Sequence, residues 1–132
     1  MREQRYHGLQ FAFLAAAAAV VASWWAGHRP FAVAVQGSSM APTLLEGDLL
    51  IATAPAGRVV ATGSLVVVEH PARPGYEMVK RVVRTTGSDG LWVEGDNATS
   101  SSDSRSFGPV ERDAIRGVVR LRYWPPARAG RL

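Results

Sequence analysis

Hydrophobic and polar positions divide the chain into two parts with different patterns. Residues 9–27 form a stretch of 19 residues without a formal charge, rich in alanine and ending near the pair Trp24-Trp25. At about 1.5 Å per residue, a helix of this length comes close to the ~30 Å thickness of a hydrocarbon core. Tryptophan is also frequent where a membrane meets water. We therefore predict a transmembrane anchor at 9–27, preceded by a short cytoplasmic N-terminus at 1–8.

Two other interpretations of this stretch stay open. A cleaved secretory signal also combines a short basic start with an apolar stretch and small residues. A helix buried in the protein would tolerate its many alanines equally well. Two arginines precede the stretch and only Arg29 follows it closely, which favours a cytoplasmic N-terminus. With an uncleaved anchor, we expect a single-pass protein of the cell membrane with its main domain on the extracytoplasmic side.

After Pro30 the pattern changes to short runs of valine, leucine and isoleucine bounded by glycine, proline and aspartate, which is typical of strands. The predicted strands are 31–36, 48–53, 64–69, 77–83, 91–94 and 115–124. A short helical turn is expected at 111–115, and Pro125-Pro126 ends the last strand. No helical periodicity of useful length follows residue 30. We predict one mainly β domain at 31–132, folded as an antiparallel sheet or partly open barrel.

Composition narrows the possible chemistry. The chain has no cysteine, which excludes disulfides, thiolate catalysis and cysteine zinc sites. Its net charge of +4 is scattered without a run of like charges, so we predict no nucleic-acid partner. Of the 15 basic residues, 14 are arginine and one is Lys80. Arginine stays protonated in proteins, whereas lysine can lose its proton when it is buried.

Lys80 lies in the middle of a predicted strand. Alternation along 77–83 places Met78, Lys80 and Val82 on one face. An amine on such an apolar face loses hydration, which lowers its pKa and allows it to act as a general base. The alternative is a lysine at a sheet edge whose amine reaches out to water.

A turn of unusual composition follows the first predicted strand. Gly37 and Pro42 surround Ser38 and Ser39, and such a turn can expose one hydroxyl. Serine is an ordinary turn residue, however, and needs a base to become a nucleophile. The candidate bases are His7, His28, His70 and Lys80. Lys80 is favoured, because two of the histidines flank the predicted anchor and His70 ends a strand.

Five blocks of residues together resemble the type I signal peptidase family. The blocks are Ser39-Met40-x-Pro42-Thr43, Gly47-Asp48, Lys80-Arg81, Gly95-Asp96-Asn97, and Ser101-x-Asp103-Ser104-Arg105-x-x-Gly108. Their order and spacing agree with that family over residues 33–124. The resemblance implies a β-rich serine endopeptidase with a Ser-Lys dyad, and we expect neither a metal nor a cofactor.

The resemblance also implies roles for individual residues. Ser39 would attack the scissile carbonyl, Lys80 would accept its proton, and Ser101 would orient the lysine amine. The remaining residues would shape the site: Asp103 and Arg105 brace it, Gly95, Asp96 and Asn97 form the turn beneath it, and Met40 and Pro42 set the nucleophile turn.

The sequence departs from longer relatives at two places. Gly37 stands where some members have a serine hydroxyl for the oxyanion, so the backbone N–H of Ser39 would be the main oxyanion donor. Only residues 84–94 separate the Lys80 strand from Gly95, so the large insertion of longer members is absent.

The function that we predict is cleavage of secretory signal peptides or propeptides after small residues. The partners would be an extended peptide and the lipid bilayer. An alternative is a maturation peptidase for one substrate, similar to small relatives that trim the propeptide of nickel superoxide dismutase. A self-cleaving repressor would need a DNA-binding domain where residues 1–30 offer an apolar stretch. A non-catalytic binding module is disfavoured because Ser39, Lys80 and Ser101 are all present.

Overall fold

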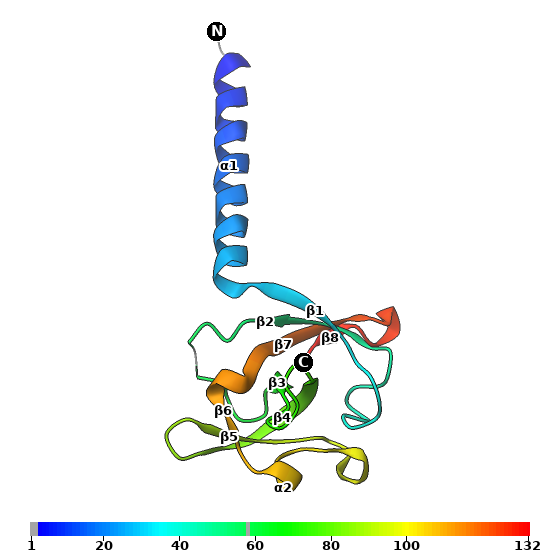
Figure 1. Ribbon diagram of the computed structural model, residues 1–132. Coiled ribbons are helices and arrows are strands. Elements are labelled where there is room, and N and C mark those ends of the chain that lie inside the picture. Colours follow the sequence, from blue (N-terminus) through cyan, green and yellow to red (C-terminus); the bar gives the residue numbers. More distant parts are fainter. Residues whose placement is uncertain (1–2, 58) are drawn as a thin grey trace.

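One long N-terminal helix and one β domain make up the described part of the protein (Figure 1). The computed structural model describes the backbone of residues 3–57 and 59–132, and side chains within this range from residue 12 onward. The helix α1 spans Glu3–His28. The strands are β1 Pro30–Ala34, β2 Leu49–Thr53, β3 Leu65–Glu69, β4 Glu77–Thr86, β5 Gly90–Glu94, β6 Val110–Glu111, β7 Ile115–Trp124 and β8 Gly130–Arg131.

The strands form one antiparallel sheet with two open ends. Their order is β1-β2-β7-β3-β4-β5-β6, and β8 pairs with β7. The long strand β7 pairs with β3 through its first half and with β2 along most of its length. The predicted antiparallel β fold is therefore confirmed, in the form of an open sheet.

The curled sheet encloses a hydrophobic core on each side of β3. Val66 and Val68 of β3 belong to one buried cluster, whereas Leu65 and Val67 belong to the other. Because both faces of β3 are buried, its sequence is an unbroken apolar run instead of an alternating one. This arrangement brings β1 and β4 near each other although they lie far apart in the strand order.

The predicted strands are found, with small shifts at their ends, and β4 continues to Thr86. The helical turn expected at 111–115 is a 3-10 helix at Arg112–Ala114. Five short elements were not predicted: β6, β8, the four-residue helix α2 at Ser104–Phe107, and the 3-10 helices at Ala98–Ser100 and Pro126–Arg128. Elements this short contain too few residues to show a period, so the absence of helical periodicity did not exclude α2.

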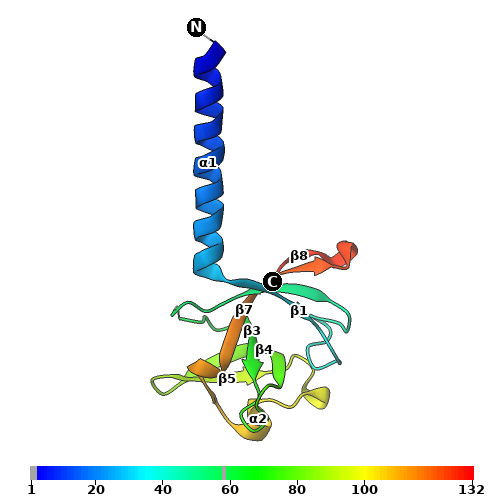
Figure 2. The same ribbon diagram turned by 45° about the horizontal axis from the view of Figure 1, so that its top comes forward.

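The helix α1 stands away from the sheet (Figures 1 and 2). Its side chains from residue 12 to residue 27 are exposed, so the interpretation as a helix buried in the protein is wrong. Among the described residues, no helix combines the length and apolarity needed to cross a membrane. The structure has the helix α1 over the predicted anchor, and the anchor itself stays a prediction. The predicted cytoplasmic N-terminus at 1–8 lies partly outside the described residues.

Candidate active site

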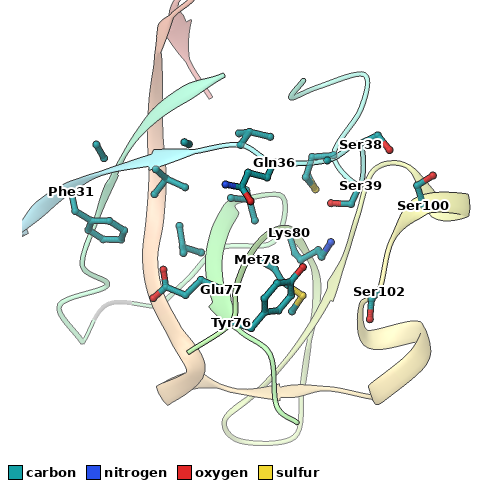
Figure 3. A pocket seen from close by; sticks show the side chains of 18 residues that line it. Phe31, Gln36, Ser38, Ser39, Tyr76, Glu77, Met78, Lys80, Ser100 and Ser102 are labelled. Atoms are coloured by element: carbon teal, nitrogen blue, oxygen red, sulfur yellow. The ribbon is translucent and has the colours of Figure 1, made fainter. Parts of the chain in front are cut away.

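A pocket of about 540 Å³ lies between β1, the segment that follows it, and the first half of β4 (Figure 3). Ser39 and Lys80 lie at one end of this pocket. Phe31 and Glu77 lie toward its other end (Figure 3). The pocket is therefore elongated along the two strands, with a hydroxyl and an amine at one end.

Two strand edges that border this pocket have no strand partner among the described residues. β1 is the first strand in the sheet order and pairs only with β2. On β4, pairing with β5 begins at Arg81, so residues 77–80 pair only with β3. Unpaired strand edges offer backbone N–H and C=O groups to another extended chain. The pocket is consequently suited to an extended peptide.

The turn after β1 presents Ser39 to the pocket. The preceding pairing ends at Ala34, and the turn is fixed by Met40, which is 2% exposed and part of a core cluster. The Leu44 N–H donates to the Met40 carbonyl oxygen over 2.9 Å, while Pro42 is exposed. In Figure 3 the Ser39 hydroxyl lies on the side of Lys80, whereas the Ser38 hydroxyl points away from it.

Lys80 is buried in the position that strand alternation predicts. Its side chain is 3% exposed, and it shares the buried face of β4 with Met78 and Val82. The alternative of an amine that reaches out to water is therefore wrong. Burial lowers the pKa of the Lys80 amine below its usual value, the charge of Asp103 acts in the opposite sense, and the charge of Arg105 lowers it further.

Ser101 connects the lysine to a buried carboxylate. The Lys80 Nζ donates to Ser101 Oγ over 3.2 Å, and Ser101 Oγ donates to Asp103 Oδ2 over 2.5 Å. Because the single hydroxyl proton of Ser101 is directed at Asp103, its oxygen lone pairs are available to the amine. The lysine is thus held in one direction at the inner end of the pocket.

Asp103 is fully buried and accepts several hydrogen bonds. Burial by itself raises the pKa of this carboxyl, but hydrogen bonds from Arg105, the Gly95 N–H and Ser101 outweigh it and hold the pKa well below its usual range. The Arg105 guanidinium also donates to the Gly95 carbonyl oxygen over 3.1 Å. Asp103 and Arg105 therefore form a partly buried framework instead of the exposed ion pair that their sequence positions would also allow.

The turn at 95–97 lies directly against the site. A Cβ atom on Gly95 would come within 2.2 Å of Ser101 Oγ and 2.6 Å of the Ser39 carbonyl oxygen. Asp96 accepts two hydrogen bonds from the Arg81 guanidinium, of 2.8 and 2.7 Å. Asn97 bonds to the backbone of Ser38 and Ser39. All three residues of this predicted block therefore lie where they can shape the site.

A second framework holds the other side of the turn around Ser39, and the sequence did not reveal it. Asp48 is fully buried and binds both Arg122 and Arg128. Arg122 also donates to the Thr43 carbonyl oxygen over 2.9 Å, and Asp48 accepts from the Leu45 N–H over 3.0 Å. The block Gly47-Asp48 was recognised, but its arginine partners come from the C-terminal segment and no local pattern marks them.

The histidines do not join this arrangement. The buried ring of His70 packs against Phe107 and Tyr76, and its Nδ1 accepts from the Ala72 N–H. His28 stacks on Trp24 at the end of α1. The side chain of His7 is not among the side chains that the structure describes. Lys80 is therefore the candidate base that the described structure brings into the same pocket as Ser39.

Gly95→Ala is expected to disable the site with a much smaller effect on the fold. The added methyl group would overlap Ser101 Oγ, so the lysine would lose its acceptor or the Ser39 backbone would shift. A misplacement of about 1 Å at a reacting group typically costs about 10²-fold in rate. Initial cleavage rates measured beside the thermal unfolding of the same samples would test this. A variant with normal rates would contradict the close packing of Gly95 on Ser101.

Comparison with known proteins places this chain within a class of proteolytic enzymes. The chain matches the family model described as signal peptidase, peptidase S26, over residues 5–89 and 85–124. It belongs to this signal peptidase family and is a peptidase.

Several curated relatives are proteases of mitochondria. The mitochondrial ATP-independent inner membrane protease subunit 1a of Arabidopsis thaliana is 35% identical over 122 residues, covering 74% of this chain and 73% of the relative. The mitochondrial inner membrane protease subunit 1 of Xenopus tropicalis is 32% identical, and the match covers 70% of this chain and 68% of the relative. The mitochondrial inner membrane protease subunit 2 of Danio rerio is 32% identical, and the match covers 74% of this chain and 66% of the relative. These relatives support signal-peptidase-like processing of peptides.

Proposed function

We propose that this protein is a membrane-attached serine endopeptidase in which Ser39 is the nucleophile and Lys80 the general base. The observation that carries the proposal is the buried Lys80 amine, held by Ser101 in the pocket that Ser39 also lines. A buried lysine has a lowered pKa and a larger neutral fraction, which a general base requires.

The chemistry follows from these groups. Ser39 Oγ attacks the scissile carbonyl carbon while its proton passes to the neutral Lys80 amine. The carbonyl oxygen becomes an oxyanion, for which the Ser39 N–H is the proposed donor. The Lys80 ammonium then protonates the departing amine, which leaves an ester between the peptide and Ser39. A water molecule, deprotonated by Lys80, attacks this ester and releases the peptide acid with both residues restored.

The proposed substrate is an extended peptide that pairs with the free edges of β1 and β4. In such a strand, alternate side chains face the enzyme and would select small residues near the cleaved bond. Signal peptides and propeptides present such segments to processing enzymes. The processing role is supported by the family and by the protease names of the relatives.

The proposed membrane attachment relies on α1. Its exposed apolar side chains include Phe13, Leu14, Val20 and the Trp24-Trp25 pair, all of which lie outside the β domain. The relatives named above are described as inner membrane proteases. We infer that α1 lies in a bilayer and that the β domain works beside the membrane.

If α1 is an uncleaved anchor, the full-length protein should remain in the membrane fraction after an alkaline carbonate wash, with an unprocessed mass. Immunoblotting of the washed pellet and mass spectrometry of the recovered protein would check both points. A soluble product that lacks residues 1 to about 25 would instead support the cleaved signal.

The range of substrates is tested by comparing cells that contain the active enzyme with cells that contain Ser39→Ala. N-terminal peptides of exported proteins would be identified in both. A general signal peptidase should leave many precursors uncut in the variant. A maturation peptidase, such as one for a single propeptide, should change one protein and leave the other N-termini as they were. Unchanged N-termini throughout would contradict a processing role.

A further inference from the structure

The backbone on either side of Ser39 is bonded to one asparagine. The Asn97 Nδ2 donates to the Ser38 carbonyl oxygen over 3.1 Å, and the Asn97 backbone N–H donates to the Ser39 carbonyl oxygen over 2.9 Å. The Ala41 N–H also donates to the Ser38 oxygen, over 3.1 Å. Two successive peptide groups of the nucleophile turn are therefore fixed by residue 97, which lies 58 positions beyond Ser39 in the chain.

The orientation of the Asn97 amide is itself determined by a neighbour. The Thr99 Oγ1 donates to the Asn97 Oδ1 over 3.0 Å. Since this bond engages the amide oxygen, the amide nitrogen is the end that faces Ser38. The chain of bonds thus runs from the Thr99 hydroxyl through the Asn97 amide to the Ser38 carbonyl.

Fixing the Ser38 carbonyl also fixes the direction of the Ser39 N–H. The Ser38–Ser39 peptide group is planar, and in a trans peptide the C=O and the following N–H point in opposite directions. An oxygen held toward Asn97 therefore turns the Ser39 N–H away from Asn97, which does not line the pocket that Ser39 lines. Among the described residues, this N–H has no hydrogen-bond acceptor, so it is available to a ligand.

This N–H matters more here because a second donor at residue 37 is missing. Gly37 has no side chain, and its φ of 72° lies in the left-handed region, which an L-residue with a side chain rarely adopts. The nucleophile turn therefore cannot readily provide an extra hydroxyl at this position. The oxyanion must depend strongly on how well the Ser39 N–H is oriented.

We propose that Asn97 is a positioning residue for the oxyanion hole, with Thr99 holding its amide in the active orientation. Asn97 does not line the pocket, and it acts through the Ser38–Ser39 peptide group. This inference rests on the proposed function of Ser39. It assigns a specific task to Asn97, beyond a general contribution to the shape of the 95–97 turn.

The test compares Asn97→Asp and the pair Thr99→Val and Thr99→Ser with the full-length wild-type enzyme. Asn97→Asp keeps the size of the side chain but replaces the donor with an acceptor that repels the Ser38 oxygen. We expect kcat to fall about 10²-fold, the typical cost of a small misplacement, while KM changes by less than about threefold. Thr99→Val should lower kcat in the same way but less, and Thr99→Ser, which keeps the hydroxyl, should restore it.

The affinity for a peptide aldehyde distinguishes a positioning role of Asn97 from a merely structural one. Its carbon is attacked reversibly by the serine oxygen, and its oxygen then occupies the position of the oxyanion. Its affinity should fall by the same factor as kcat/KM, whereas the affinity for an uncleavable peptide of the same sequence should stay constant. In Thr99→Val the pH dependence of kcat should also be unchanged, because this change leaves Lys80 in place and adds no charge near it.

Near-normal kcat in Asn97→Asp would overturn the inference, as would equal losses of affinity for the aldehyde and the uncleavable peptide. If Asn97→Asp fails to fold, the contrast between Thr99→Val and Thr99→Ser decides, and equal kcat values in those two variants would overturn it. Failure of the proposed function would look different: the Ser39→Ala variant would still cleave, or the wild-type enzyme would not bind the aldehyde.

Discussion

Ser39→Ala is expected to lower peptide cleavage by about 10⁴-fold or more while leaving the fold intact. Removing a serine nucleophile has effects of this order because the remaining groups contribute only binding and oxyanion stabilisation. The change removes one half-buried hydroxyl and no core packing, since Met40 anchors the turn. The measurement is the steady-state cleavage of a signal-peptide substrate, with thermal unfolding as the check on folding.

Ser38→Ala is the matched control for this prediction. It removes the same group one residue earlier, from an exposed side chain whose hydroxyl points away from Lys80 (Figure 3). We expect it to retain substantial activity. An inactive Ser38→Ala beside an active Ser39→Ala would show that the nucleophile has been assigned to the wrong serine.

Lys80→Arg is expected to be as inactive as Lys80→Ala. A guanidinium keeps the positive charge and roughly the reach of lysine, but it does not give up its proton at the pH of the assay. Lys80→Met is the matched control for packing, because it replaces the amine with an uncharged side chain of similar length. It should fold and be inactive too. Near-normal cleavage by Lys80→Arg would exclude Lys80 as the base, because a purely structural lysine tolerates arginine.

The pH dependence of the wild-type enzyme follows from the same group. Burial lowers the pKa of Lys80, and only the neutral amine can accept the Ser39 proton. The rate at saturating substrate should therefore rise with pH as the amine loses its proton and then reach a plateau. At a pH below that pKa most of the amine is protonated, so the rate should be low. The apparent pKa should lie below ~10.4, the value for free lysine, and an apparent pKa at or above that value would contradict a buried base.

The sequence predicted the part of the site that is carried by local patterns. Strand alternation placed Lys80 on a buried face with Met78 and Val82, because the side-chain period of a strand is independent of the tertiary fold. The strands of the main sheet were found for the same reason. The Gly/Pro turn around Ser39 was also visible, but only the resemblance connected this turn with Lys80 and Ser101.

The sequence did not show the interactions between segments that lie far apart in the chain. The Asp48 network joins the start of β2 to Arg122 and Arg128, and no spacing rule links these positions. The bond between Asn97 and Ser38 has the same character, because it depends on the final placement of two turns. The very short strands β6 and β8 form by pairing with longer neighbours, so their own residues carry no period.

The central claim is that Ser39 forms a covalent ester with the peptide, and mass spectrometry can observe this ester directly. The full-length enzyme would be mixed with a peptide ester whose acyl part ends in a small residue, and the reaction would be stopped with acid within the first turnover. Digestion and sequencing of the modified peptide locate the acyl group. We predict that it lies on Ser39 in the wild-type enzyme and is absent from Ser39→Ala. An acyl group on Ser38, Ser101 or Ser102 would contradict the account.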